Sequence, residues 1–192
     1  MIQTEIKSII LGSIDLKNRV LGDEILLNSV QQAAETIINA YKQGKKVLFC
    51  GNGGSAADAQ HLAAELSGRF YKNRPALYAE ALHCNTSYLT AVANDYGYHN
   101  IYSRLVEAMG NEGDVLVGLS TSGKSSNVLM ALSVAKANKM HTIAFTGEGG
   151  LAMKNLVDIN ISTPSSDTPR IQEVHMMLGH IICYLVEKEL FP

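Results

Sequence analysis

A glycine-rich segment at residues 51–55, Gly-Asn-Gly-Gly-Ser, has the composition of an anion-binding loop. It follows the apolar run 47–50, which predicts a buried strand, and it precedes a predicted helix in which Ser55 and Asp58 fit a capping box. Glycines let the backbone approach a ligand closely, and the amide groups at a helix start attract negative charge. The spacing matches neither GxGxxG nor GxxxxGKS, which disfavours a dinucleotide or a nucleoside triphosphate. The segment therefore indicates either a site for a smaller anion or a tight turn without a ligand.

A second loop, residues 120–125, offers four hydroxyl groups, one ammonium group and several backbone amides. Its sequence is Ser-Thr-Ser-Gly-Lys-Ser, and it again stands between a predicted strand and a predicted helix. These donors suit phosphate oxygens, although serines at such a place also serve as helix caps. Ligands of open α/β sheets bind beyond the carboxyl ends of the strands, so the two loops together predict a phosphate site.

Acid–base or metal chemistry is offered by His61 and Glu65, which lie four residues apart on one face of the helix predicted after the first loop. Two side chains at this spacing can bind one ion, although they also form ordinary surface contacts. Gln172, His175 and His180 interrupt an apolar helical pattern near the C-terminus, where a buried structural histidine is the alternative interpretation. In a regular helix about 12 Å of rise separates Gln172 from His180. Both can bind one atom only if the helix begins later or if the site forms between subunits.

The elements around these residues predict an α/β fold, a parallel β-sheet with helices on both faces in a three-layer arrangement. Two leading helices are predicted from apolar residues spaced by three and four, with Gly22 ending the first, Asp23 capping the second and Gly44 closing it. Strands are predicted at 47–50, 79–82, 115–119, 141–146 and 157–161, and helices from Ser55, at 87–92, at 101–108, from Ser125 and after Pro169. No flexible linker divides the chain, so residues 1–192 are expected to form one domain.

Composition excludes several classes of protein. A hydrophobic fraction of 46% excludes intrinsic disorder, and a net charge of -2 gives no electrostatic footprint for nucleic acid. Three scattered cysteines without CxxC spacing indicate neither a disulfide framework nor a zinc knuckle, as expected in a reducing cytoplasm. No signal peptide or membrane span is predicted. Charged residues make up 18%, below the roughly 25% of typical domains, which favours an oligomer.

Four segments resemble the phosphoheptose isomerase family of sugar isomerase (SIS) domain enzymes. They are CGNGGSAADAQHLAAELSGRF at 50–70, AVANDYGY at 91–98, GDVLVGLSTSGKSSNV at 113–128 and RIQEVHMMLGH at 170–180. The resemblance spans nearly the whole chain. It implies a single SIS domain in which residues 1–44 serve packing and oligomerisation, a homotetramer with active sites at subunit interfaces, and one zinc ion per subunit without a nucleotide cofactor.

The resemblance also implies roles for individual residues. The zinc-ligand positions fall on His61, Glu65, Gln172 and His180, of which glutamine is an unusual ligand for zinc. The substrate positions fall on Asn52, Gly53, Gly54, Glu65, Asn94, Asp95, Ser120, Thr121, Ser122, Ser125 and Gln172. Residues 120–125 are expected to hold the phosphate, and Asn52, Asp95 and Gln172 to meet sugar hydroxyls.

The implied reaction converts sedoheptulose 7-phosphate into D-glycero-D-manno-heptose 7-phosphate through an enediolate, as the first step towards ADP- or GDP-heptose for lipopolysaccharide, capsule or another surface polysaccharide. Glu65 is expected to be the base at C1, and His180 the acid that moves protons between oxygens and assists ring opening. Because a free glutamate has a pKa of about 4.3, Glu65 is expected to be desolvated or coupled to the metal.

Three alternatives remain open from the sequence. A noncatalytic adaptor resembling the DnaA initiator-associating protein would bind a protein instead of a sugar, and a regulatory SIS domain would act as a sugar-phosphate sensor. An isomerase of another sugar phosphate would share both loops. Other segments are expected to be structural: a solvated loop at 71–74, a turn at 94–98, His83, His99 and His141 as structural or surface residues, and Cys50 as a strand residue.

Overall fold

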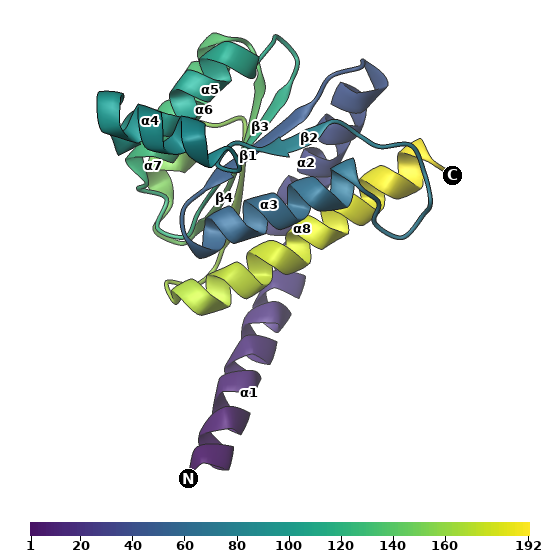
Figure 1. Cartoon of the computed structure of the whole chain (residues 1–192). Helices are drawn as coiled ribbons and strands as arrows, with labels where there is room; N and C mark the ends of the chain where they lie inside the picture. Colours follow the sequence, from purple (N-terminus) through teal and green to yellow (C-terminus); the bar gives the residue numbers. More distant parts are fainter.

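The computed structural model describes residues 1–192 as a five-stranded parallel sheet between two layers of helices (Figure 1). The strands are β1 (Val47–Gly51), β2 (Ala79–Ala81), β3 (Val115–Ser120), β4 (His141–Gly147) and β5 (Ile159–Thr163), in the spatial order β2-β1-β3-β4-β5. Every neighbouring pair is parallel. The predicted fold class is therefore confirmed, and the predicted strands agree closely except β5, which begins two residues later than expected.

Eight α-helices and one 3-10 turn connect and cover the strands. They are α1 (Ile2–Leu21), α2 (Glu24–Lys42), α3 (Gly54–Ser67), α4 (Thr86–Tyr96), η1 (Tyr98–Asn100), α5 (Ile101–Met109), α6 (Ser126–Ala137), α7 (Leu151–Lys154) and α8 (Thr168–Leu190). The Asp23 carboxylate accepts the Leu26 backbone N–H at 3.0 Å and caps α2, as predicted. Gly44, at φ +70°, follows the end of α2, where a residue without a side chain is favoured.

The two faces of the sheet carry separate hydrophobic cores. Val47 and Phe49 of β1 pack into the larger core with α2, α3 and α8, whereas Leu48 and Cys50 pack into a second core with α5 and α6. Alternate side chains of a strand point to opposite faces, so a strand covered on both sides must be apolar throughout. This explains why β1 and β3 are continuous apolar runs.

Helix α1 extends away from the body of the molecule (Figure 1). Its buried residues, Ser13, Leu16 and Val20, lie in its second half, near the body. Large apolar side chains along it are exposed, namely Ile2, Ile6, Ile9, Ile10, Leu11 and Ile14. No helix of the structure is both long and apolar enough to cross a membrane.

Candidate active site

The glycine loop joins β1 to α3 and has a conformation that requires its glycines. Gly53 has φ +55° and is the N-cap residue of α3. A Cβ atom on Gly54 would lie 2.3 Å from Nε2 of Gln172, so a side chain here would displace the Gln172 amide from the loop. The predicted capping box is wrong: no side chain caps α3, and Ser55 lies inside the helix because the N-cap is Gly53, two residues before Ser55.

Asn52 of this loop is held by three hydrogen bonds to its side chain. Asn127 Nδ2 donates to Asn52 Oδ1 at 2.8 Å, and Asn52 Nδ2 donates to Asn127 Oδ1 at 2.9 Å. The Tyr98 hydroxyl donates to the same Asn52 Oδ1 at 3.0 Å. The Val128 N–H donates to Asn127 Oδ1 at 2.9 Å, which fixes the orientation of both amides. Asn52 is therefore left with one free N–H, so it can donate to a ligand but is saturated as an acceptor.

Neither Asn127 nor Tyr98 is among the residues selected from the sequence. The signal for Asn127 is a fully buried amide among apolar neighbours at the start of α6, directly after the serine-rich loop. Tyr98 carried no such signal, because only the folded chain brings η1 beside the glycine loop.

The serine-rich loop leaves β3 beside the glycine loop. β3 pairs with β1, with Gly51 opposite Leu119, so both loops emerge from the same edge of the sheet, as predicted. The hydroxyls of Ser120 and Ser125 lie 2.8 Å apart, and the Lys124 N–H donates to the Ser122 hydroxyl at 3.2 Å.

The backbone of this loop is pressed against the turn after β4. Gly123 has φ +64°, and a Cβ atom on it would lie 2.3 Å from the Cα of Gly150. The Gly147 N–H donates to the carbonyl of Thr121 at 2.9 Å. The loop that is expected to hold the phosphate is therefore supported from a third strand.

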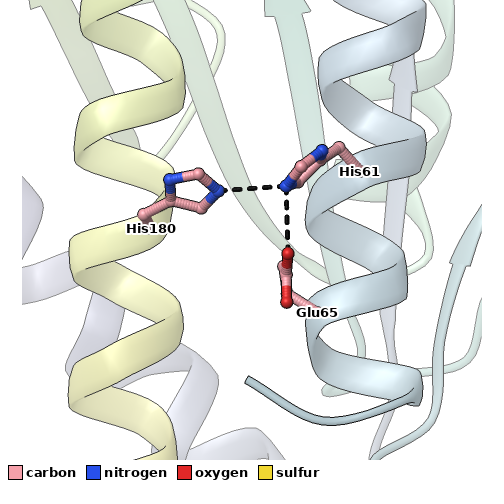
Figure 2. Close-up of side chains that lie close together, drawn as sticks. All are labelled: His61, Glu65 and His180. Carbon is pink, nitrogen blue, oxygen red and sulfur yellow. Dashed lines mark hydrogen bonds and ion pairs between the residues drawn. The ribbon is translucent and has the colours of Figure 1, made fainter. Parts of the chain in front are cut away.

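Three of the predicted chemical side chains meet between α3 and α8 (Figure 2). His61 Nε2 lies 3.0 Å from Glu65 Oε1 and 3.1 Å from His180 Nε2. The three ligand atoms all lie within 4.8 Å of one another. The cluster is open to solvent on one side, since His61 is exposed while Glu65 and His180 are half-buried.

A close helix contact brings these side chains together. Next to His180, Gly179 faces Leu62, and a Cβ atom on Gly179 would lie 2.6 Å from a Leu62 methyl carbon. Helices α3 and α8 run side by side (Figure 1), and the absence of a side chain at position 179 lets them approach. The Phe70 ring lies against His180 on another side, with ring centroids 5.6 Å apart.

Gln172 is not part of this cluster within one chain. Helix α8 is regular from Thr168, so about 12 Å of rise separates Gln172 from His180. The Gln172 side chain lies instead against Gly54 at the glycine loop. The structure thus brings together three of the four predicted metal residues and places the fourth beside the predicted sugar-binding loop.

Asp58 is a further acidic group one turn before His61, and the sequence pointed to it only as a helix cap. Its Oδ2 atom is buried without a hydrogen-bond partner. Burial raises the pKa of the Asp58 carboxyl to about 6, against an opposing contribution from His61. Asp58 thus adds a second carboxyl group to the helix face that carries His61.

Asn94 and Asp95 lie in the last turn of α4, so the turn predicted at 94–98 is wrong in its first part; the chain reverses only at Gly97, which has φ +85°. Both side chains are exposed, and Asn94 Nδ2 donates to Asp95 Oδ1 at 2.8 Å. They precede the glycine-loop neighbour Tyr98 by three and four residues, but their side chains hydrogen-bond to each other and to neither loop.

His175 has a structural role, in agreement with the alternative interpretation. Its ring is fully buried, and Nε2 lies 3.1 Å from the carbonyl oxygen of Thr146. Burial lowers its pKa to about 4, although the Thr146 hydrogen bond favours the charged form. Cys50 is a buried strand residue as predicted, and burial raises the pKa of its thiol to about 12.

Comparison with known proteins identifies the arrangement. The SIS domain family model matches residues 19–147. The phosphoheptose isomerase of Clostridium acetobutylicum is 53% identical over 190 residues, covering 99% of this chain and 95% of that protein. Among solved structures, the phosphoheptose isomerase of Francisella tularensis superposes with a TM-score of 0.93 at 36% identity, covering 98% of this chain and 99% of that one. The Neisseria gonorrhoeae enzyme gives a TM-score of 0.90 at 42% identity, covering 98% and 100%.

These similarities extend over the whole fold, including both loops and the helix pair that carries His61, Glu65 and His180. They confirm the resemblance inferred from the four sequence segments. The chain belongs to the phosphoheptose isomerase family of SIS-domain proteins.

Proposed function

We propose that the chain interconverts sedoheptulose 7-phosphate and D-glycero-D-manno-heptose 7-phosphate. The observation that carries the proposal is the cluster of His61, Glu65 and His180 in a chain whose relatives are named phosphoheptose isomerase. Two loops suited to phosphate and sugar hydroxyls leave the same edge of the sheet. The heptose would then enter the synthesis of a surface polysaccharide such as lipopolysaccharide or capsule, in the cytoplasm.

The residues divide the reaction between them. The serine-rich loop at 120–125 binds the phosphate, and Asn52 donates its free N–H to a sugar oxygen. Glu65 takes the proton from C1 of the ketose and returns it to C2, while His180 moves a proton between the two oxygens. The ketose and the aldose have the same atoms, so the reaction needs neither an oxidant nor a reductant. Asn94, Asp95 and Gln172 complete the sugar contacts.

The donor set at the cluster fits zinc. His61 Nε2 lies within hydrogen-bond distance of both Glu65 Oε1 and His180 Nε2, but the single proton on it cannot serve two acceptors well. Ligands of a tetrahedral zinc ion lie about 3.4 Å apart, close to the two distances from His61 Nε2, and three protein ligands leave one position open. Zinc bound there would act as a Lewis acid toward the substrate oxygens. Gln172 lies outside the cluster of its own chain, so it would be the fourth protein residue near the ion only if a second copy of the chain supplies it.

The distance between the two loops and the His61, Glu65 and His180 cluster supports an oligomer. About 10 Å of helix rise lies between Gly54 and His61, so one chain holds its loops and its cluster apart. We propose a homotetramer in which a second copy completes each site. The exposed apolar side chains of α1, within the predicted packing segment 1–44, are the proposed contact surface.

The proposal is tested by incubating the purified chain with sedoheptulose 7-phosphate in deuterated water. We expect formation of the aldose with deuterium at C2, loss of turnover with a chelator, and recovery with added zinc. Turnover of another sugar phosphate alone would contradict the choice of substrate. Absence of turnover with any of them, from folded and zinc-supplied protein, would favour a noncatalytic adaptor or a sensor.

A further inference from the structure

An ion pair buried at the far ends of α3 and α8 is not explained by the proposed reaction. Arg74 Nε lies 3.1 Å from Glu187 Oε1, and both side chains are 2% exposed. The expectation of a solvated loop at 71–74 is wrong for Arg74, because the loop folds back and buries this guanidinium. Burying two charges is costly, so a pair that serves only stability is readily replaced by apolar residues.

Glu187 binds the backbone of the loop that follows α3. Its carboxylate accepts the backbone N–H groups of Phe70, Tyr71 and Lys72 at 3.1, 2.8 and 3.0 Å. Although burial raises the pKa of Glu187, these hydrogen bonds and Arg74 together lower it below its ordinary value. The carboxylate is therefore charged at neutral pH, and each of its hydrogen-bond partners is a donor.

Arg74 binds the end of α3 itself. Its Nη2 donates to the carbonyl of Glu65 at 2.9 Å, and its Nη1 donates to the carbonyl of Leu66 at 2.8 Å. These carbonyls lie in the last turn of the helix, where a cation is also favoured by the helix dipole. The guanidinium thus connects the backbone of a cluster residue to Glu187, which lies seven residues after His180 on the neighbouring helix.

The same contacts place an aromatic ring on His180. The three backbone N–H groups that bind Glu187 fix the position of Phe70, whose ring lies against His180. Phe70, Tyr71 and Tyr184 line a shallow pocket with His180. The ion pair therefore links the end of α3 to α8 and holds the loop whose Phe70 ring lies on one side of His180.

We propose that Arg74 and Glu187 are positioning residues that hold Glu65 and His180 at the separation needed for metal binding and proton transfer. This inference rests on the proposed role of the cluster. Loss of the ion pair should weaken zinc binding and lower kcat by about tenfold each, the effect typical of groups that orient ligands. KM should change by less than twofold, because neither phosphate loop touches the pair.

The test compares Glu187→Gln with Glu189→Gln in the full chain. Glu189 is also on α8 and also paired, with Lys42 at 2.8 Å, but that pair is exposed and touches neither the cluster nor the 70–72 loop. We expect tenfold weaker zinc binding, measured by competition with a chromophoric chelator, only for Glu187→Gln. Arg74→Lys keeps the charge but loses the fork of donors to the α3 carbonyls. Arg74→Lys should show the same loss of zinc affinity. If Glu187→Gln does not fold, Arg74→Lys alone tests the positioning role.

A second measurement separates this inference from the proposed function. In metal-free protein with labelled histidines, the His61–His180 and Phe70–His180 ring contacts should weaken in Glu187→Gln and persist in Glu189→Gln. Intact ring contacts and unchanged zinc affinity in folded Glu187→Gln and Arg74→Lys would overturn the positioning role. A wild-type chain that binds no zinc would instead refute the metal site, while the ring contacts would still decide whether the pair positions His180.

Discussion

Helix α8 carries two histidines, His175 and His180, in opposite situations. His175 is fully buried against β4, with Nε2 fixed at Thr146 and a pKa lowered to about 4. His180 is half-buried and faces His61 across the gap to α3 (Figure 2). Five residues turn a helix by about 140°, so one ring faces the sheet and the other faces the neighbouring helix. The same residue type is a buried structural group in one place and an accessible member of an ionisable cluster in the other.

The difference lies in what each ring can still do. His175 is kept neutral by burial and has one ring nitrogen committed to a backbone carbonyl, so it has no access to a ligand. His180 lies at an open cluster whose other members are ionisable. Of the two histidines, only His180 has the access to solvent and to other ionisable groups that proton transfer or metal binding requires.

The largest expected effect is on activity at the open cluster. His180→Gln and Glu65→Gln should each lower kcat by about a thousandfold, because each removes a group that transfers a proton. Thermal unfolding should change little, since both side chains are partly exposed. Kinetics with sedoheptulose 7-phosphate and calorimetry would measure both. A His180→Gln chain with near-normal kcat would contradict a role for His180 that differs from that of His175.

His175 should dominate the acid sensitivity of stability. Its pKa is about 4 in the folded chain and about 6.5 in the unfolded chain. Above pH 6.5 the ring is neutral in both states, so His175 does not lower the free energy of unfolding there. As pH falls from 6.5 to 4, only the unfolded chain takes up the proton, and about 3 kcal/mol of unfolding free energy is lost. Urea unfolding at pH 7.5 and pH 4 should show this extra loss in the wild type but not in His175→Gln. Equal losses in both chains would show that another group is responsible.

Gly179→Ala should disturb the face of α8 that carries His180 and leave the face that carries His175 unchanged. The added methyl group meets Leu62 at the α3 contact, and overpacking of this kind costs about 2 kcal/mol. The His61–His180 contact should widen, with weaker zinc binding, while His175 keeps its bond to Thr146. Zinc competition and the pH dependence of unfolding report the two faces independently. A loss of the His175 pH dependence together with zinc affinity would show that the faces are coupled.

Asn127 and Asn52 also differ as a buried structural side chain and a partly exposed one that can meet a ligand, and the expected effect is smaller. Buried Asn127 holds the partly exposed Asn52, so Asn127→Ala should leave kcat nearly unchanged and raise KM by about fivefold, the cost of losing about 1 kcal/mol of orientation. Steady-state kinetics measure this split. A fall in kcat with constant KM would place Asn127 in the chemical step instead.

Local pattern sufficed for much of the fold. The apolar runs of β1, β3 and β4, the glycine that ends α2 and the Asp23 cap were all predictable, because each depends on residues within a few positions. The capping box at Ser55 failed because the positive φ of Gly53 starts α3 earlier. Arg74 was misjudged because its partner, Glu187, lies 113 residues away.

The sequence by itself determined that the 51–55 and 120–125 loops follow the carboxyl ends of parallel strands, and that His61 and Glu65 share a helix face. Both follow from the local alternation of strand and helix patterns and from helical periodicity. Only the tertiary structure decided that His180 joins this pair while His175 and Gln172 do not. That choice depends on how α8 packs on the sheet and on α3, and packing is set by contacts such as Gly179 with Leu62 and Arg74 with Glu187, between residues far apart in the chain.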